Sequence, residues 1–226
     1  MITSQFSTIA IAVIGSTTMR ISSTQRRRVL STPAVFFSAT LSPLESMKQL
    51  LGGDEEDACF ALSSPFPPEN LRVYVRSLST RYHRRADTAA QIAGLIVQMA
   101  ESKNGNYIVF FPSYAYLRLV LLQLDESRLP PLFVQPPQME ESDRDAFFEA
   151  FSDGGTPHLG LCVLGGLFSE GIDLPGDRLI GVMVIGIGLP TPSQKLEAIR
   201  TRYDELFGDG FHYACRIPGM QKVLQA

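Results

Sequence analysis

Residues 163–176 read VLGGLFSEGIDLPG and indicate the fold more clearly than any other stretch of the chain. They join two apolar runs, Leu159–Leu164 and Leu179–Ile187, through a glycine-rich turn. Unbroken apolar runs are typical of strands that are covered on both faces of a parallel sheet. At the carboxyl end of such a strand, glycines let backbone amides approach a ligand and polar side chains can bind it. The turn therefore predicts a ligand site that includes Gly166, Ser169, Glu170, Gly171 and Asp173.

Short apolar runs alternate with amphipathic segments along the whole chain. Strands are predicted at Thr8–Ile14, Ala34–Ser38, Arg72–Arg76, Tyr107–Phe111, Leu132–Gln135, Leu159–Leu164 and Leu179–Ile187. Helices are predicted at Ser22–Leu30, Leu44–Leu51, Arg84–Glu101, Tyr114–Leu124, Glu141–Phe151 and Pro192–Phe207. Because this alternation builds βαβ units, we expect an α/β fold of three layers, with a mainly parallel central sheet flanked by helices. We expect a single domain over 1–226, with 1–45 as an irregularly packed N-terminal extension.

Composition narrows the class of protein. An apolar content of 45% and a charged content of 19% are ordinary for a soluble globular domain. The formal net charge of −3 means that any nucleic-acid contact must come from a local basic patch. The 3 cysteines are far apart and form no C-x-x-C pair, which argues against a disulfide framework, a zinc site or an iron–sulfur site. The apolar run 9–15 is too short for a signal peptide or membrane span, so we expect a cytoplasmic protein.

Ser38 and Thr40 are the first candidate site residues. They lie at the end of a predicted strand, just before a helix that Pro43 can start. Their hydroxyl groups can exchange hydrogen bonds with a neighbour that senses a phosphate group. A helix cap is the competing interpretation, and the tripeptide taken alone favours the cap.

Ser113 and Tyr114 directly follow the predicted strand Tyr107–Phe111. Exposed amides at the start of the next helix favour phosphate, and a tyrosine ring can stack on a base. The competing interpretation is a core strand followed by a serine cap.

Arginines and tyrosines are interleaved over residues 72–85. Basic residues among aromatic ones suit a groove for single-stranded nucleic acid. The candidate contacts are Arg81, Arg84 and Arg85. A solvated loop that leads into an arginine-rich helix start explains the same pattern equally well.

Two other kinds of site are not predicted. Residues 186–190, GIGLP, lack the third glycine of a dinucleotide-binding loop, and prolines stand where the helix should begin. His83, His158 and His212 are isolated from one another in the sequence, so neither a metal site nor a catalytic triad is indicated.

In their order along the chain, these strings resemble the motifs of DinG/XPD-type DNA helicases of superfamily 2. The tripeptide at 38–40 resembles motif III, residues 106–114 resemble motif IV, and the turn at 163–176 resembles motif V. The last two residues, Gln225 and Ala226, resemble the opening of motif VI. The resemblance covers nearly the whole chain and implies the second, C-terminal RecA-like lobe, which is P-loop NTPase-like but has no phosphate loop.

The resemblance also implies roles for the candidate residues. The motif V residues would organise contacts on the ATP side and between the lobes, and Ser38 and Thr40 would transmit the nucleotide state. Ser113, Tyr114 and the arginine cluster would meet single-stranded DNA. The intact protein would be an ATP-dependent DNA helicase, moving 5′→3′, acting in DNA repair and using ATP with Mg²⁺. Its partners would be single-stranded DNA and the first helicase lobe.

Parts of such a helicase are missing from this sequence. It contains no G-x-x-x-x-G-K-[ST] and no D-E-A-H-like run, and both lie in the first lobe of this family. The arginines that follow the opening of motif VI, including the arginine finger, are also not in the sequence. We therefore expect a fragment that binds no cofactor tightly and does not hydrolyse ATP alone.

Two other functions stay open on the sequence. One is a nucleic-acid-binding module that never had motor function. The other is an α/β protein-interaction module with a degenerate site, which would bind no oligonucleotide. In addition, the apolar edge at 35–37 has no first-lobe sheet to join, so we expect a homo-oligomer formed through the N-terminal segment.

Overall fold

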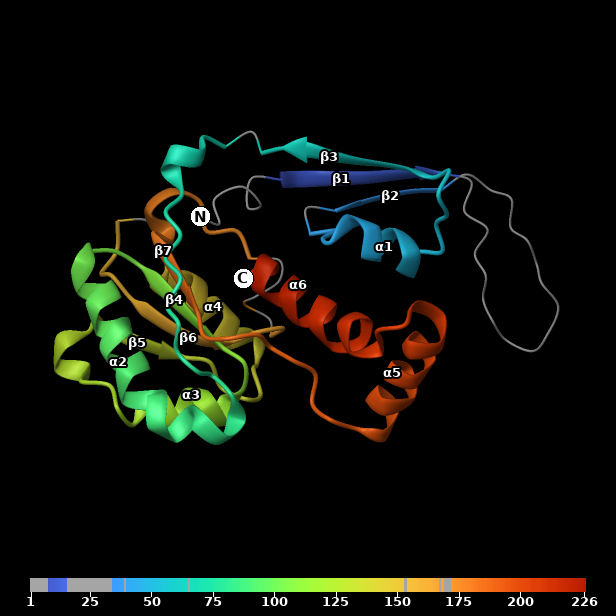
Figure 1. The fold of residues 1–226 in the computed structure, drawn as a ribbon. Helices are drawn as coiled ribbons and strands as arrows, with labels where there is room; N and C mark the ends of the chain where they lie inside the picture. Colours follow the sequence, from blue (N-terminus) through green and yellow to red (C-terminus); the bar gives the residue numbers. More distant parts are fainter. Residues whose placement is uncertain are drawn as a thin grey trace. The chain divides into compact units, whose positions relative to one another are not determined.

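The computed structural model describes residues 8–15, 34–38, 40–64, 66–152, 154–166, 168 and 172–226. Contacts divide the chain into two compact units, Met1–Val75 and Arg76–Ala226, and each unit is described by itself (Figure 1). The first unit extends well past the N-terminal extension 1–45 that we expect from the sequence. A single domain over 1–226 stays a prediction.

The first unit contains a three-stranded antiparallel sheet in the order β2-β1-β3. Its elements are β1 (Thr8–Gly15), β2 (Ala34–Ser38), α1 (Leu44–Leu50), β3 (Ala58–Ser63) and the short 3-10 turn η1 (Pro68–Asn70). Thus β2 does join a sheet, because it pairs with β1. Phe37 of β2 and Phe60 of β3 both lie opposite Ala12 of β1. Since directly opposed residues point to one face, Phe37 and Phe60 share a face of the sheet.

In the N-terminal part, one predicted strand is wrong and one observed strand is not predicted. Residues 71–81 form no strand. Val73 and Val75 alternate with arginines as a strand would, but both are more than half exposed, so the segment lacks the burial that stabilises a strand. The strand β3 is not predicted at all, because its residues Ala-Cys-Phe-Ala-Leu-Ser show no clear alternation. The predicted helix Ser22–Leu30 lies outside the described residues.

The second unit is built on a four-stranded sheet in the order β5-β6-β4-β7, and every pairing in it is parallel. Its strands are β4 (Tyr107–Phe111), β5 (Leu132–Val134), β6 (Leu159–Val163) and β7 (Gly181–Val184). The intervening helices are α2 (Arg85–Ser102), α3 (Tyr114–Leu121) and α4 (Glu141–Ala150), with 3-10 turns η2 (Tyr82–Arg84), η3 (Glu126–Arg128) and η4 (Gly176–Arg178). This confirms the predicted α/β fold with a mainly parallel sheet.

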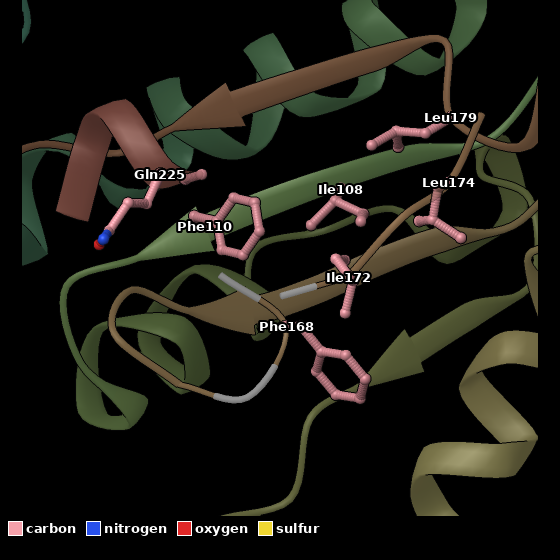
Figure 2. A pocket seen from close by; sticks show the side chains of 8 residues that line it. Ile108, Phe110, Phe168, Ile172, Leu174, Leu179 and Gln225 are labelled. Carbon is pink, nitrogen blue, oxygen red and sulfur yellow. The ribbon is translucent and has the colours of Figure 1, made fainter. Parts of the chain in front are cut away.

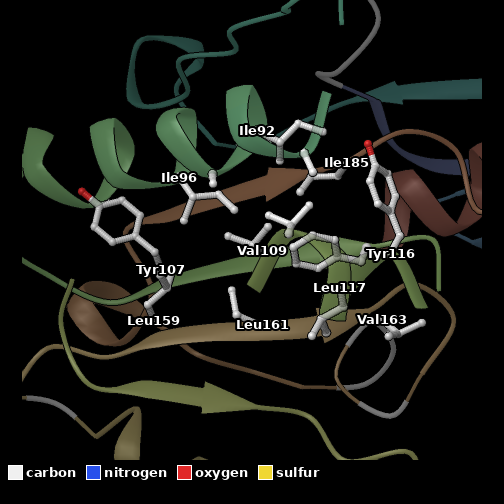
Figure 3. Packing of buried hydrophobic residues seen from close by; sticks show 14 residues of the cluster. Ile92, Ile96, Tyr107, Val109, Tyr116, Leu117, Leu159, Leu161, Val163 and Ile185 are labelled. Carbon is white, nitrogen blue, oxygen red and sulfur yellow. The ribbon is translucent and has the colours of Figure 1, made fainter. Parts of the chain in front are cut away.

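Side chains of the two central strands, β6 and β4, point alternately to the two faces of the sheet, and each face has its own hydrophobic core. On one face, Tyr107, Val109 and Phe111 of β4 pack with residues of α2 and α3, as Figure 3 shows. On the other face, Ile108 and Phe110 pack with Phe147 and Phe151 of α4 and with other apolar residues. Successive residues of a strand point to opposite faces, so one unbroken apolar run supplies both cores. The helices α2 and α3, the sheet, and the helix α4 therefore form three successive layers.

Side-chain hydrogen bonds fix the starts of α3 and α4. Ser113 is the N-cap of α3, and its Oγ accepts a hydrogen bond of 3.3 Å from the backbone N–H of Tyr116. The first turn of α4 carries the acids Glu141 and Asp143, and Asp143 accepts a bond of 3.0 Å from the N–H of Glu140. Such bonds from side-chain oxygens satisfy backbone N–H groups at helix starts, which lack the usual acceptor four residues earlier in the helix.

The C-terminal part of the unit consists of α5 (Gln194–Phe207), the π-helical turn η5 (His212–Arg216) and α6 (Ile217–Gln225). As predicted, α5 ends at Phe207, and the next residue, Gly208, adopts a left-handed φ of 78°. The sequence does not predict α6, because Pro218 falls in its first turn. Proline has no N–H to bond the carbonyl four residues earlier and its ring crowds that carbonyl. The wider π turn just before Pro218 relieves this conflict.

The described helices include none long and apolar enough to cross a membrane. All three cysteines are free thiols, with Cys162 and Cys215 buried and Cys59 partly exposed.

Candidate functional site

The candidate site of the second unit lies where its four parallel strands end. Ser113 and Tyr114 follow β4, Gln135 follows β5, the glycine pair 165–166 comes after β6, and Gly186 follows β7. Parallel pairing brings these carboxyl ends to one edge of the sheet. In open α/β sheets this is the edge at which ligands bind.

Tyr114 is fixed by a contact to the neighbouring strand end. Its hydroxyl donates a hydrogen bond of 3.1 Å to the carbonyl oxygen of Pro136, just beyond β5. Burial raises the pKa of Tyr114, and the nearby thiol of Cys162 adds to the rise. The side chain is therefore a neutral aromatic ring and hydrogen-bond donor at physiological pH, which suits stacking on a base.

The arginine-bearing segment at 78–85 is held at the same edge. The hydroxyl of Thr88 donates to the carbonyl oxygen of Ser79 at 3.0 Å. Thr80 packs so closely on Gly186 that a Cβ on that glycine would stand 2.5 Å from Oγ1 of Thr80. Gly186 also has a φ of 73°, which residues with a side chain rarely adopt. Two independent constraints thus require glycine where the segment crosses the end of β7.

The three candidate arginines differ in their surroundings. Arg81 and Arg84 are exposed to solvent, and Nε of Arg84 forms a salt bridge of 2.9 Å with Oδ2 of Asp87. Arg85 is half-buried, and its Nη1 donates a hydrogen bond of 3.3 Å to Oγ of Ser113. The structure therefore brings two predicted site residues, Arg85 and Ser113, into direct contact.

Sequence reasoning misses Gln135, which shapes the glycine-rich turn. Its side chain is 4% exposed, and its Oε1 accepts a hydrogen bond of 2.8 Å from the N–H of Val163. A Cβ on Gly166 would stand 2.9 Å from Nε2 of Gln135. A polar side chain between a strand and two prolines is the signal that could have revealed it. Gln135 thus fixes the point where the turn leaves β6.

Lys222 of α6 contributes positive charge to the turn. Its Nζ lies 3.3 Å from the position that a Cβ on Gly165 would occupy, and its stem also lies against Gly188. Gly165 adopts a left-handed φ of 70°. The side chain of a lysine therefore crosses the turn that the sequence singles out.

The remaining motif V candidates are only partly described. Ser169, Glu170 and Gly171 lie outside the described residues. Asp173 is exposed, whereas its neighbours Ile172 and Leu174 line a cavity of about 120 Å³ (Figure 2). The exposed Gln225 at the end of α6 borders the same cavity. Pockets for drug-sized ligands measure roughly 300–1,000 Å³, so this cavity is too small for a nucleotide.

Ser38 and Thr40 belong to the first unit. Their hydroxyl oxygens lie 3.3 Å apart, and Oγ of Ser38 also accepts a bond of 3.2 Å from the N–H of Thr40. They do not cap α1, whose N-cap residue is Pro43 and carries no side-chain cap bond. The helix-cap interpretation of this pair is therefore wrong, and the coupling role stays a prediction.

A family model described as the helicase C-terminal domain matches residues 96–226, which is more than half of the chain. The chain belongs to this helicase C-terminal domain family. The match covers β4, all of the glycine-rich turn and α6, and begins within α2. It confirms the resemblance to the C-terminal lobe of DinG/XPD-type superfamily 2 helicases.

Curated relatives of this helicase C-terminal domain are much longer proteins. A probable ATP-dependent helicase of Methanocaldococcus jannaschii is 26% identical over 165 residues, which cover 69% of this chain and 24% of the relative. The ATP-dependent DNA helicase chl1 of Schizosaccharomyces pombe is 26% identical over 178 residues, which cover 70% of this chain and 21% of the relative. The chain thus spans about a quarter or less of the length of these relatives.

Solved structures support the fold. A structure titled as XPD in its apo form has a TM-score of 0.59 and 19% identity, covering 84% of this chain and 39% of that one. A second, titled as the XPD helicase, has a TM-score of 0.58 and 20% identity, covering 83% of this chain and 34% of that one. At this identity the likeness shows the RecA-like α/β fold.

The described residues fit the cofactors of an ATP-dependent helicase only in part. The turn at Gly165 offers close backbone approach to a phosphate group. Magnesium prefers carboxylate oxygens, but the part of the chain that the structure describes has no cluster of three acidic, histidine or cysteine side chains. A magnesium ion that is bound together with a nucleotide takes only one or two carboxylates besides the phosphates and needs no such cluster.

Proposed function

We propose that this chain is the lobe of an ATP-dependent DNA helicase that binds single-stranded DNA and completes an ATP site with a first lobe. The family match and the names of the relatives support an ATP-dependent helicase as the parent protein. The 5′→3′ direction, a role in DNA repair and a cytoplasmic location follow only from the sequence resemblance and are part of this proposal.

One observation carries the proposal of DNA binding. The hydroxyl of Ser113 and the ring of Tyr114 lie at the carboxyl edge of one parallel sheet, where Arg85 contacts Ser113 and the exposed Arg81 and Arg84 stand beside Arg85 in the chain. A hydroxyl donor and guanidinium groups bind phosphate oxygens, and an aromatic ring binds a base. This combination suits a single strand, whose backbone and unpaired bases are both accessible.

ATP would contact the glycine-rich turn of this lobe from one side only. Phosphoryl transfer also needs a phosphate-binding loop with its lysine and a magnesium-binding acid. The 226 residues contain no G-x-x-x-x-G-K-[ST]. We therefore propose that a first helicase lobe supplies these groups and Mg²⁺, and that the 226 residues alone do not turn ATP over.

The test measures oligonucleotide binding and ATP turnover on the same purified chain. We expect binding of a labelled oligothymidine that weakens steeply as salt rises, and no multiple turnover of ATP with or without DNA. Sustained DNA-stimulated turnover by the chain alone would contradict the two-lobe account. Absence of oligonucleotide binding at low salt would instead favour a protein-interaction module.

A further inference from the structure

Arg85 lies between two tyrosine rings at the first position of α2. Its guanidinium carbon is 4.6 Å from the ring centroid of Tyr116 and 5.5 Å from that of Tyr82. Its Nε donates a hydrogen bond of 3.3 Å to the carbonyl oxygen of Thr80, and its Nη1 donates one of 3.3 Å to Oγ of Ser113. Two cation–π contacts and two hydrogen bonds thus fix the plane of the guanidinium.

The hydrogen bonds of Ser113 then have a defined direction. Its Oγ accepts one bond from Arg85 and another, also of 3.3 Å, from the backbone N–H of Tyr116. A serine hydroxyl has two acceptor lone pairs and one proton to donate. With both lone pairs engaged, only the proton remains, and within the described ranges of the chain this hydroxyl donates no hydrogen bond.

The ring that supports Arg85 is itself anchored. Tyr116 is 1% exposed, and its hydroxyl lies 3.4 Å from that of Thr88, which also holds the segment at residue 79. The arginine therefore rests on a rigid part of the core, in contrast to the exposed Arg81 and Arg84. A fixed cation behind a hydroxyl makes that hydroxyl a donor of constant orientation.

We infer that Arg85 is a positioning residue, which orients Ser113 as a one-way donor toward a phosphodiester oxygen of single-stranded DNA. Arg85 acts through Ser113 and neutralises no phosphate itself, while Arg81 and Arg84 contact the backbone directly. This inference rests on the proposed DNA-binding function and specifies the chemistry of its site. The ligand atom must be an acceptor without a proton, as in a phosphodiester.

The salt dependence of binding separates a positioning role from a direct contact. Each phosphate that a protein neutralises on a single strand contributes about 0.7 to the slope of log affinity against log salt. For fluorescein-labelled oligothymidine and the whole chain, Arg81→Gln should lower this slope by about 0.7. Arg85→Gln should weaken binding about tenfold at each salt concentration and leave the slope unchanged.

Further variants complete the test. Arg85→Lys keeps the charge but loses the planar fork, so it should weaken binding as much as Arg85→Gln. Ser113→Ala should show the same loss of affinity, and adding Arg85→Gln to it should cause no further loss.

Arg128→Gln is the matched control. Arg128 pairs with Glu101 at the opposite, amino-terminal edge of the sheet, so its replacement should leave DNA binding unchanged. Circular dichroism shows whether each variant is folded. If Arg85→Gln unfolds the chain, Arg85→Lys takes its place in the comparison with the unaltered chain.

Each outcome has a separate meaning. Three results would overturn the positioning role and leave the DNA-binding proposal standing. They are a salt slope lowered by Arg85→Gln, near-normal binding by Arg85→Lys, and additive losses of affinity in the double variant. Absence of binding by the unaltered chain would overturn the proposed function together with this inference.

Discussion

The side chain of Gln135 bridges two neighbouring strand ends, because its Oε1 accepts a hydrogen bond of 2.8 Å from the backbone N–H of Val163. Val163 is the last residue of β6, so the bond determines where the glycine-rich turn begins. The contact is buried, and a buried donor that loses its acceptor is costly.

Replacement of Gln135 by alanine should therefore destabilise the second unit. We expect the free energy of unfolding to fall by about 1–3 kcal/mol, since the N–H of Val163 loses its acceptor. Urea denaturation followed by circular dichroism measures the change. Gln91→Ala, at an exposed position of α2, is the control and should stay within about 0.5 kcal/mol of the unaltered chain. Equal effects of the two substitutions would remove the role given to Gln135.

Replacement of Gly186 by alanine should reduce both stability and DNA binding. Gly186 and Gly176 both have left-handed φ values, of 73° and 63°. Either alanine therefore costs about 1–2 kcal/mol of backbone strain. Only a Cβ at residue 186 would collide with Thr80, whereas one at residue 176 meets nothing within 4 Å.

The two glycine variants thus form a matched pair. Oligothymidine binding should weaken several-fold more for Gly186→Ala than for Gly176→Ala, because only the former displaces the arginine-bearing segment. Fluorescence anisotropy at one salt concentration is sufficient to compare them. Identical affinities would show that the packing of Thr80 on Gly186 does not support the DNA-binding segment.

Cys162 should make stability depend on alkaline pH. Burial raises the pKa of its thiol in the folded state, so the folded chain holds the proton while the unfolded chain releases it above about pH 8.5. The contribution of the protonated thiol to the free energy of unfolding is fully present below that pH and is lost as pH rises. The free energy of unfolding falls by at most about 1.4 kcal/mol per pH unit. Tyr114, whose pKa is also raised, acts only above about pH 10.

Denaturation between pH 8.5 and 9.5 tests this effect, and Cys162→Ala should flatten the decline. Cys59→Ala, which removes a partly exposed thiol, is the matched control. Iodoacetamide gives a second readout, since it should modify Cys59 of the folded chain well before the buried Cys162 and Cys215. Rapid alkylation of Cys162 in the folded protein would contradict its place in the core.

The first unit should self-associate through its exposed sheet face. Phe37 and Phe60 share that face and are 79% and 50% exposed, and Val35 and Leu62 are also more than half exposed. Apolar patches of this kind promote association, and a second copy offers a matching patch. We predict a dimer in sedimentation velocity that Phe37→Asp shifts toward monomer, whereas Arg118→Asp, at an exposed position of α3, does not. A strict monomer at every concentration would remove this prediction.

The sequence predicts the central sheet well because burial dominates there. The bounds of β4 agree with the prediction, and those of β6 differ by one end residue, since both strands are buried along their whole length. The cap at Ser113 is also predictable, because the hydroxyl and the helix it starts are adjacent in the chain.

Other features depend on contacts between distant residues, which a single sequence does not reveal. Arg85 and Ser113 are 28 residues apart, and so are Gln135 and Val163. The sequence pattern assigns Arg85 to the DNA because it lies among other arginines and tyrosines, and this pattern does not reveal its contact with Ser113. The alternation of apolar and basic residues at 72–76 predicts a strand that is not formed. A strand also needs a neighbouring strand to pair with, and the pattern of one segment cannot show whether that neighbour exists.

The most direct test of the proposed site is photo-crosslinking of the chain to an oligonucleotide that contains 4-thiothymidine. Mass spectrometry then identifies the attached peptides. Our account predicts attachment at the carboxyl edge of the sheet, in the peptides that contain Tyr82 and Tyr114. Attachment confined to peptides at the amino-terminal edge, around Glu101 and Arg128, would contradict it.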